Sequence, residues 1–204
     1  MSLGCSGFVY GVHVAKGFME SAGLTCGIFV TADPYSKIVN RYDKNTSLLF
    51  GDAATATLLT DSPVLNIGLA RFGTDGSGGE NIINRDGLLE MAGRQVFNFA
   101  ASTVPGQVAD LLEAARLEQD DIDLFILHQG SRHIVQTLIR RIGLDPVKTP
   151  IALDQTGNTV SSSIPLILAD HMHRPDVTQM LLSGFGVGLS WGSVLLTRNT
   201  QVTP

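Results

Sequence analysis

The sequence predicts an α/β fold layered around a mixed β-sheet. Short apolar runs rich in β-branched residues alternate with stretches of helical periodicity, and the chain has no short-period repeat or low-complexity segment. Charged residues make up only 16% of the 204 residues, against about 25% in an average soluble protein. So low a fraction argues against a disordered chain or a charge-coated solenoid. It favours a protein that buries much of its surface in layers or in an oligomer.

The predicted elements begin with a helix at residues 8–22. Its apolar stripe consists of Phe8, Val12, Ala15 and Met19. No strand precedes this helix, although in a layered α/β protein a strand normally leads into such a helix. We therefore expect either an unusual start to the fold or a fragment of something longer.

Strands and loops follow this helix. Residues 26–32 form a short apolar run that predicts a buried strand, and residues 33–46 are polar and turn-rich, which indicates a surface loop. Residues 53–60 and 64–72 are predicted as two further strands. The glycine, Asp and Asn residues of 73–87 indicate a long irregular excursion.

A second unit begins near residue 91. Its first expected elements are a helix over 91–117, broken or restarted near Pro105, and a strand at 123–127. A helix at 132–142, ended by Gly143, and a helix at 160–173 follow. The last two expected strands, 179–183 and 189–197, enclose the glycine-rich turn 184–188. Helices and strands alternate through most of this order, which favours layers of helices packed on a sheet.

Net charge and cysteine content exclude several classes of protein. The 14 basic and 19 acidic residues give a net charge of −5, so the chain has no basic footprint for nucleic acid or an anionic membrane. The longest apolar stretches, such as residues 164–169, are too short to span a bilayer, and the pattern of a secretion signal is absent. Two cysteines in no metal-ligand spacing form neither a disulfide framework nor a metal site. We expect a cytoplasmic protein.

Cys5 is the candidate nucleophile. It lies between small residues at the predicted N-terminus of the first helix, where unpaired N–H groups and the helix dipole favour a thiolate. We therefore expect its pKa to fall below the free value near ~8.5. A lone cysteine is more often a small buried residue, and for Cys26, inside an apolar strand, we adopt that interpretation.

Three further features could support a nucleophile. His128 directly follows a predicted strand, at the end of a sheet where catalytic groups collect, although a histidine there is often structural. Asn158 lies in a Gly-Asn-Thr sequence that is also typical of a turn and an N-cap. The alternate glycines of 184–188 could form a plain turn or present backbone N–H groups to an oxyanion. Together with Cys5, these features match acyl transfer through a thioester.

Six motifs in order carry a resemblance to a known family. They are GCSGF at 4–8, FGDAATATLL at 50–59, MAGRQVFNFA at 91–100, HQGS at 128–131, GNTVSSSIP at 157–165 and GFGVGLSWGSVLL at 184–196. This set resembles β-ketoacyl-acyl-carrier-protein synthase III, of the thiolase-like condensing-enzyme superfamily. The resemblance implies a thiolase-like fold of five layers (αβαβα) with mixed sheets.

The resemblance also implies an active site of Cys5, His128 and Asn158. Cys5 would take an acyl group from a coenzyme A thioester, and the enolate formed by decarboxylation of malonyl-acyl carrier protein would attack it. His128 and Asn158 would donate hydrogen bonds to the thioester oxygen of the malonyl group. The oxyanion would be held by backbone N–H groups of Cys5 and of the turn Gly186-Val187-Gly188, most directly Val187. In FGD, Asp52 is expected to be structural.

Further site residues and partners follow from the same resemblance. The residues expected to bind substrate are Gln129, Ser131, Arg132 and Phe185. Acyl-CoA and acyl carrier protein are the expected partners, a homodimer is the expected assembly, and no metal or redox cofactor is required.

Two departures from the family pattern leave the acyl donor and acceptor open. HQGS stands where the family commonly has His-Gln-Ala-Asn, and Val187 stands where it commonly has the middle of three glycines. Because a β-branched residue is disfavoured at positive φ, the turn must hold Val187 in an ordinary backbone region.

The family's first third, which would precede Gly4, has no counterpart in this chain. We expect residues 4–60 to be the remainder of the N-terminal thiolase-like half, carrying the cysteine, and residues 61–204 to be the C-terminal half, carrying His128 and Asn158. We therefore expect the chain alone to be a poor catalyst.

Three alternatives remain. A papain-like protease also has Cys, His and Asn in this order, but Cys5 lacks the Cys-Gly-Ser-Cys-Trp signature of that family. An acyltransferase of the same fold could pass the acyl group to an alcohol or amine, with His128 as general base. The chain could also be an inactive truncated subunit that serves folding or partnering.

Overall fold

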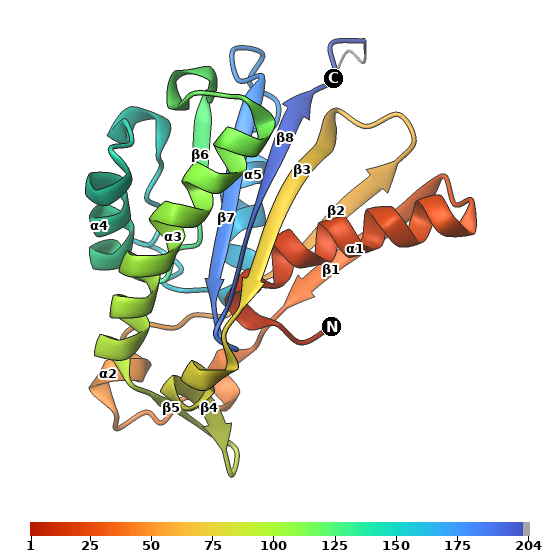
Figure 1. Ribbon diagram of the computed structural model, residues 1–204. Coiled ribbons are helices and arrows are strands. Elements are labelled where there is room, and N and C mark those ends of the chain that lie inside the picture. The colour runs from red at the N-terminus through yellow and green to blue at the C-terminus, as the bar shows by residue number, and fades with distance from the viewer. Residues whose placement is uncertain (202–204) are drawn as a thin grey trace.

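The computed structural model describes residues 1–201, whose helices and strands form four layers (Figure 1). The first layer consists of the helices α3 (Gly93–Ala115) and α4 (Arg132–Ile142), and the second is a sheet of four strands in the order β3 (Leu65–Thr74), β8 (Ser190–Arg198), β7 (Gln179–Gly186) and β6 (Leu124–Leu127). The third layer consists of the helices α1 (Gly7–Ala22) and α5 (Ser163–His171). The fourth is the strand pair β1 (Cys26–Ala32) and β2 (Ala54–Thr60).

The four-stranded sheet is mixed, as the sequence predicts. β6 runs parallel to β7, whereas β8 pairs antiparallel with both β7 and β3. Its apolar side chains alternate between the faces: Leu124 and Ile126 pack with α1 and α5, while Phe125 and Leu127 pack with α3 and α4. A strand buried on both faces reads as a continuous apolar run, which explains why residues 123–127 were recognisable as a strand.

The excursion after β3 carries smaller elements where the sequence predicts irregular chain. A 3₁₀ turn (Gly76–Asn81) leads into the hairpin of β4 (Ile82–Arg85) and β5 (Leu88–Met91). The predicted loop at 33–46 likewise contains a 3₁₀ turn (Tyr35–Lys37) and begins the short helix α2 (Lys44–Ser47). Together these elements form the lower end of the molecule in Figure 1.

The predicted break near Pro105 is wrong, because α3 continues through the proline. Proline removes the N–H that would bond the carbonyl four residues earlier. That carbonyl, of Ala101, instead accepts a hydrogen bond from the Arg141 guanidinium of α4 at 3.1 Å. The buried residues Val104 and Val108 also anchor the helix on either side of the proline.

Three other predictions need correction. The predicted helix at 160–173 begins as a 3₁₀ turn (Val160–Ser162) and is α-helical only over α5. The glycine run at 184–188 is not a turn throughout, because β7 extends to Gly186. The strand at 26–32 is present, but much of it is exposed, and Cys26 is exposed rather than buried. β1 is exposed because α1 covers only one face of the β1–β2 pair, and the side chains on the other face reach solvent.

No helix among residues 1–201 combines the length and apolar character that a membrane crossing requires.

Candidate active site

The site forms where two helices begin. α1 and α5 are each preceded by a 3₁₀ turn, Gly4–Ser6 and Val160–Ser162, and the two turns contact each other. The first residue of each turn has left-handed backbone geometry, with φ of 49° at Gly4 and 56° at Val160. Glycine adopts this conformation freely, whereas a β-branched residue does so under strain. The two turns therefore begin with the same backbone conformation, although only the turn that begins with Gly4 has the residue type expected there.

The end of β7 crosses directly over Cys5. A Cβ atom built on Gly186 would lie 2.7 Å from Cys5 Cβ and 2.9 Å from its Sγ, so only glycine fits at that position. The backbone N–H groups of Val187 and of Cys5 itself are in hydrogen-bonding range of the sulfur and act to lower the thiol pKa. Val187 is not among the residues with positive φ, as its β-branched side chain requires.

The expected low pKa of Cys5 is wrong. Burial, and then the nearby carboxylate of Asp33, raise the thiol pKa to about 12 despite the two backbone N–H groups. Cys5 is only 4% exposed, and a buried thiolate loses its hydration. Cys5 also precedes α1 within the 3₁₀ turn, and Ser6, not Cys5, occupies the N-cap position, with no side-chain capping bond. The resting site therefore holds a protonated thiol.

Asp33→Asn is expected to make Cys5 more reactive, because it removes the negative charge that opposes the thiolate. Because exposed Cys26 would also react, we specify a Cys26→Ser background. At pH 8, alkylation of Cys5 by iodoacetamide should become roughly threefold to tenfold faster. In both proteins the rate should rise with pH toward the thiol pKa, and the curve of Asp33→Asn should lie at lower pH. Peptide mass spectrometry over a pH series measures this.

The matched control is Asp52→Asn. Asp52 is an exposed carboxylate that, like Asp33, accepts hydrogen bonds from the backbone and hydroxyl of a serine, here Ser36. It does not contribute to the shift at Cys5, so this variant should leave the alkylation rate unchanged. An Asp33→Asn protein that reacts no faster than its parent between pH 7 and 10 would refute the electrostatic role of Asp33.

His128 follows β6 directly and is 2% exposed. Its Nδ1 lies 2.7 Å from the Ser163 hydroxyl of α5, which fixes the orientation of the ring, and its ring packs edge-on against Phe185. Burial lowers the pKa of His128 to about 3, and a hydrogen bond with the backbone of Val160 opposes this only in part. The imidazole is therefore neutral throughout the neutral pH range.

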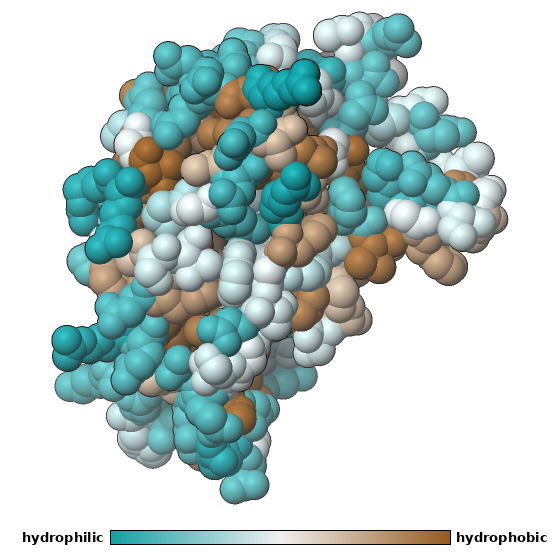
Figure 2. Space-filling view, in the orientation of Figure 1, coloured by the Kyte–Doolittle hydropathy of each residue, from teal (hydrophilic) through white to brown (hydrophobic). Residues whose placement is uncertain are grey.

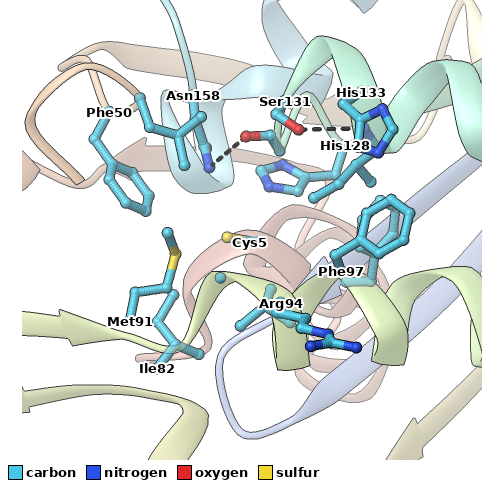
Figure 3. Close-up of a pocket in the computed structure, with 17 residues that line it drawn as sticks. Cys5, Phe50, Ile82, Met91, Arg94, Phe97, His128, Ser131, His133 and Asn158 are labelled. Carbon is cyan, nitrogen blue, oxygen red and sulfur yellow. Dashed lines mark hydrogen bonds between the residues drawn. The ribbon is translucent and has the colours of Figure 1, made fainter. Parts of the chain in front are cut away.

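Asn158 precedes the second 3₁₀ turn and is oriented by it. Its Oδ1 accepts a hydrogen bond from the Val160 N–H at 2.9 Å, so its Nδ2 is left to donate, and it does so to the Gly130 carbonyl at 3.4 Å (Figure 3). The bond from Val160 helps to hold that residue at its strained φ. The next N–H, of Ser161, bonds to the Asp33 carboxylate.

One pocket of about 380 Å³ brings Cys5, His128 and Asn158 together. Figure 3 shows the Cys5 sulfur below the Asn158 and His128 side chains, with Met91 and Ile82 on one side and Arg94 and Phe97 below and to the other. The remaining lining residues are Leu49, Phe50, Gly93, Val96, Gly130, Ser131, His133, Ile134, Phe185 and Gly186. The lining is mostly apolar, which suits an acyl chain better than a charged substrate.

The residues expected to bind substrate fall into two groups. Ser131 and Phe185 line the pocket, although the Ser131 hydroxyl also caps α4 by accepting from the Ile134 N–H. Gln129 and Arg132 do not line it. The Gln129 side chain is buried in hydrogen bonds to backbone groups of residues 127, 150 and 152, and Arg132 pairs with Asp154 at the surface. Contact of these two residues with substrate therefore stays a prediction.

Sequence reasoning missed three features of the site. Asp33 has no local signature, because its effect depends on the fold bringing it to Cys5. Arg94 is exposed and is the only Lys or Arg side chain lining the pocket among the described residues. Phe97 stacks on His133 with ring centroids 4.8 Å apart and forms part of the wall. Arg94 and Phe97 lie in the motif at 91–100, to which the sequence assigned no role.

The chain is similar to proteins of one family along most of its length. Residues 1–76 match the family description 3-oxoacyl-[acyl-carrier-protein (ACP)] synthase III, and residues 112–198 match its C-terminal counterpart. The beta-ketoacyl-[acyl-carrier-protein] synthase III of Acholeplasma laidlawii is 35% identical over 197 residues, which is 94% of this chain and 62% of that protein.

Solved structures agree with these matches. A crystal structure of a 3-oxoacyl-(acyl-carrier-protein) synthase III has a TM-score of 0.90 at 34% identity, covering 97% of this chain and 67% of the other. The priming beta-ketosynthase from the R1128 polyketide biosynthetic pathway has a TM-score of 0.85 at 29% identity, covering 98% and 65%. The fold is thus the thiolase-like α/β fold with mixed sheets. The chain spans somewhat less than two thirds of the length of the curated relative.

Proposed function

Because the chain belongs to the 3-oxoacyl-[acyl-carrier-protein] synthase III family, we propose that it carries the acyl-transfer and condensation site of such an enzyme. The observation that carries the proposal is the single pocket lined by a buried cysteine, a neutral histidine and an oriented asparagine amide. Membership of this family replaces the papain-like protease as the interpretation of Cys5, His128 and Asn158.

In the first half-reaction, Cys5 Sγ attacks the carbonyl of an acyl-CoA thioester. The new S–C bond forms as the bond to the coenzyme A sulfur breaks, and the proton of the thiol ends on the departing sulfur. Negative charge develops on the carbonyl oxygen in between. The N–H groups of Cys5 and Val187, which already lie near the sulfur, can donate to that oxygen.

In the second half-reaction, a malonyl thioester loses carbon dioxide. The electrons of the broken C–C bond form an enolate, whose oxygen accepts hydrogen bonds from His128 Nε2 and Asn158 Nδ2. The enolate carbon then attacks the acyl group on Cys5, and the released thiolate takes up a proton. A histidine with a pKa of about 3 suits this role, because it can donate a hydrogen bond without giving up or carrying an extra proton.

The rest of the pocket supports a thioester substrate. Its apolar wall suits a short acyl chain, and Arg94 at the exposed edge suits an anionic group such as the phosphates of coenzyme A. Acyl-CoA, acyl carrier protein and a second copy of the chain are the partners we propose. Fatty-acid and polyketide-type synthesis are both consistent with the named relatives.

The test is a two-step assay on the purified chain. Incubation with acetyl-CoA should add one acetyl group to the Cys5 peptide, and later addition of malonyl-acyl carrier protein should remove it and release carbon dioxide. We expect slower turnover than for the Acholeplasma laidlawii relative assayed in parallel, because the chain is shorter. Acetyl loading with transfer to an alcohol or amine, and no carbon dioxide, would favour acyl transfer without condensation. No loading of Cys5 would refute the proposal.

A further inference from the structure

The two backbone N–H groups near the Cys5 sulfur come from separate parts of the chain. One belongs to Cys5 itself, in the 3₁₀ turn Gly4–Ser6, and the other belongs to Val187, just past the end of β7. An oxyanion is stabilised well only when both donors keep fixed positions, because a hydrogen bond weakens steeply as its geometry departs from linear. The contacts that hold Val187 against the Cys5 turn therefore matter to acyl transfer.

Val187 lies outside the regular part of the sheet. β7 ends at Gly186 and β8 begins at Ser190, and these two residues form the last pair between the strands. The residues between them make a short turn. Leu189 is anchored at the far end of this turn by two backbone hydrogen bonds with Asp75, at 2.9 and 3.1 Å. Neither strand pairing nor these two bonds hold Val187 itself.

A pair of buried serines connects the Val187 turn to the Cys5 turn. The Ser190 hydroxyl donates to the Val187 carbonyl at 2.6 Å, and the hydroxyl oxygens of Ser190 and Ser6 lie 2.6 Å apart. Polar residues usually lie at the surface, and Figure 2 shows hydrophilic residues over much of one face of this molecule. Ser6 and Ser190 are instead 0% and 1% exposed, so neither hydroxyl can bond to bulk water.

Counting protons gives the direction of this hydrogen-bonded chain. A carbonyl oxygen can only accept, so the single hydroxyl proton of Ser190 is used on Val187. The proton between the two serines therefore comes from Ser6. The Leu3 carbonyl is a competing acceptor for Ser6 at 3.2 Å, but the contact with Ser190 is shorter. Ser6 thus donates to Ser190, and Ser190 donates to Val187.

This chain of hydrogen bonds acts on both donors of the site. Ser6 is the residue after Cys5, so it moves with the turn that carries the sulfur and the first N–H. The bond to the Val187 carbonyl restrains that residue on the side opposite its own N–H, while β7 restrains the side of the N–H. Hydrogen bonds in a buried series also strengthen one another.

We propose that the Ser6–Ser190 hydroxyl pair is a positioning element, which fixes the spacing between the two oxyanion donors during acyl transfer. The two serines act through Val187 and not by touching substrate. The inference rests on the proposed function, because the spacing of these donors matters only to a reaction in which a carbonyl oxygen becomes negative. Loss of the pair should therefore slow acylation of Cys5 more than it slows other reactions of the same thiol.

Ser190→Ala, in a Cys26→Ser background, tests this with two reactions of Cys5. Acylation by p-nitrophenyl acetate passes through an oxyanion and needs no coenzyme A, whereas alkylation by iodoacetamide forms no oxyanion. Both reactions need the thiolate, so the ratio of their rates isolates the oxyanion. Removing an oxyanion donor outright costs roughly 100-fold to 1,000-fold, so displacing one should slow acylation at least about tenfold. Alkylation should slow no more than about threefold, through the weaker thiolate contact with Val187. Peptide mass spectrometry measures both rates.

Ser6→Ala separates the two serines. It removes the bond that Ser190 accepts but leaves the bond from Ser190 to Val187, so it should lower the ratio of acylation to alkylation less than Ser190→Ala does. In the double variant the ratio should equal that of Ser190→Ala alone, because Ser6 acts only through Ser190. Effects of the two substitutions that multiply in the double variant would overturn the proposal.

The matched control is Ser193→Ala. Ser193 is also a fully buried serine of β8, and its hydroxyl donates to another buried serine, Ser183 of β7, at 2.9 Å. Neither residue belongs to the Val187 turn, so Ser193→Ala should keep the parent's ratio of acylation to alkylation. Equal ratios in Ser190→Ala and Ser193→Ala would overturn the proposal. A parent that reacts with p-nitrophenyl acetate but takes no acetyl group from acetyl-CoA would refute the proposed function alone, because the ratio is measured without coenzyme A.

Discussion

Cys5→Ala is expected to abolish the covalent uptake of an acetyl group from acetyl-CoA, by at least roughly a thousandfold. The sulfur is the only group of the pocket that can form the thioester, whereas the neutral His128 and the Asn158 amide can only donate hydrogen bonds to it. Intact-protein mass spectrometry after incubation with acetyl-CoA measures the effect directly. Cys5→Ser should fail in the same way on this time scale, because a buried serine hydroxyl is a much weaker nucleophile than a thiol.

The control for this prediction is the other cysteine. Cys26 is exposed at the start of β1, away from the pocket, so Cys26→Ala should retain full uptake. A folded Cys5→Ala protein that still takes up one acetyl group, or labelling that disappears in Cys26→Ala, would contradict the assignment. Far-UV circular dichroism distinguishes loss of chemistry from loss of fold, and only a small change is expected there because alanine is smaller than cysteine and equally apolar.

The parts of the fold that the sequence predicts well depend on local signals. The helix at 132–142 is found with its observed bounds because Ser131 caps its first turn and Gly143 adopts φ of 81° after its last. β6 is equally clear because all four of its residues are buried. In both cases the residues that decide the structure are neighbours in the chain.

The errors arise where a distant residue intervenes. Pro105 does not break α3 because Arg141, 36 positions later, satisfies the Ala101 carbonyl. The pKa of Cys5 is raised because folding buries it and brings Asp33 close. In both cases the prediction considers only neighbours in the sequence. The fold adds a distant residue, Arg141 for α3 and Asp33 for Cys5, that changes the outcome.

The candidate site is predictable mainly from the family resemblance. Position in the sequence alone makes Cys5 and His128 reasonable candidates, but it does not distinguish Asn158 from an ordinary turn residue. What distinguishes Asn158 is its carboxamide, oriented by the strained residue Val160, and no pattern of residue types predicts positive φ at a valine. The same applies to the walls of the pocket, which come from distant segments such as 49–50 and 91–97.

The contact between residues 49–51 and 156–158 holds Asn158 in place. The Asn158 N–H donates to the Leu49 carbonyl at 2.9 Å, and the Gly51 N–H donates to the Asn158 carbonyl at 3.0 Å. The two backbones approach so closely that a Cβ on Gly51 would lie 1.9 Å from the Thr156 carbonyl oxygen. That atom belongs to the backbone and cannot rotate away, so any side chain at position 51 must push the segment that carries Asn158 aside.

Gly51→Ala is therefore expected to damage both stability and the second half-reaction. Forcing a methyl group into this contact should cost about 2–3 kcal/mol of unfolding free energy, which corresponds to a fall in Tm of roughly 5–10 °C for a chain of this size. Decarboxylation should fall more than acetyl loading of Cys5, because Asn158 moves while the Cys5 turn does not. Gly106→Ala, where a Cβ meets nothing within 4 Å in α3, should keep or raise Tm. Equal Tm values and equal ratios of the two half-reactions in both variants would show that the 49–51 contact does not position Asn158.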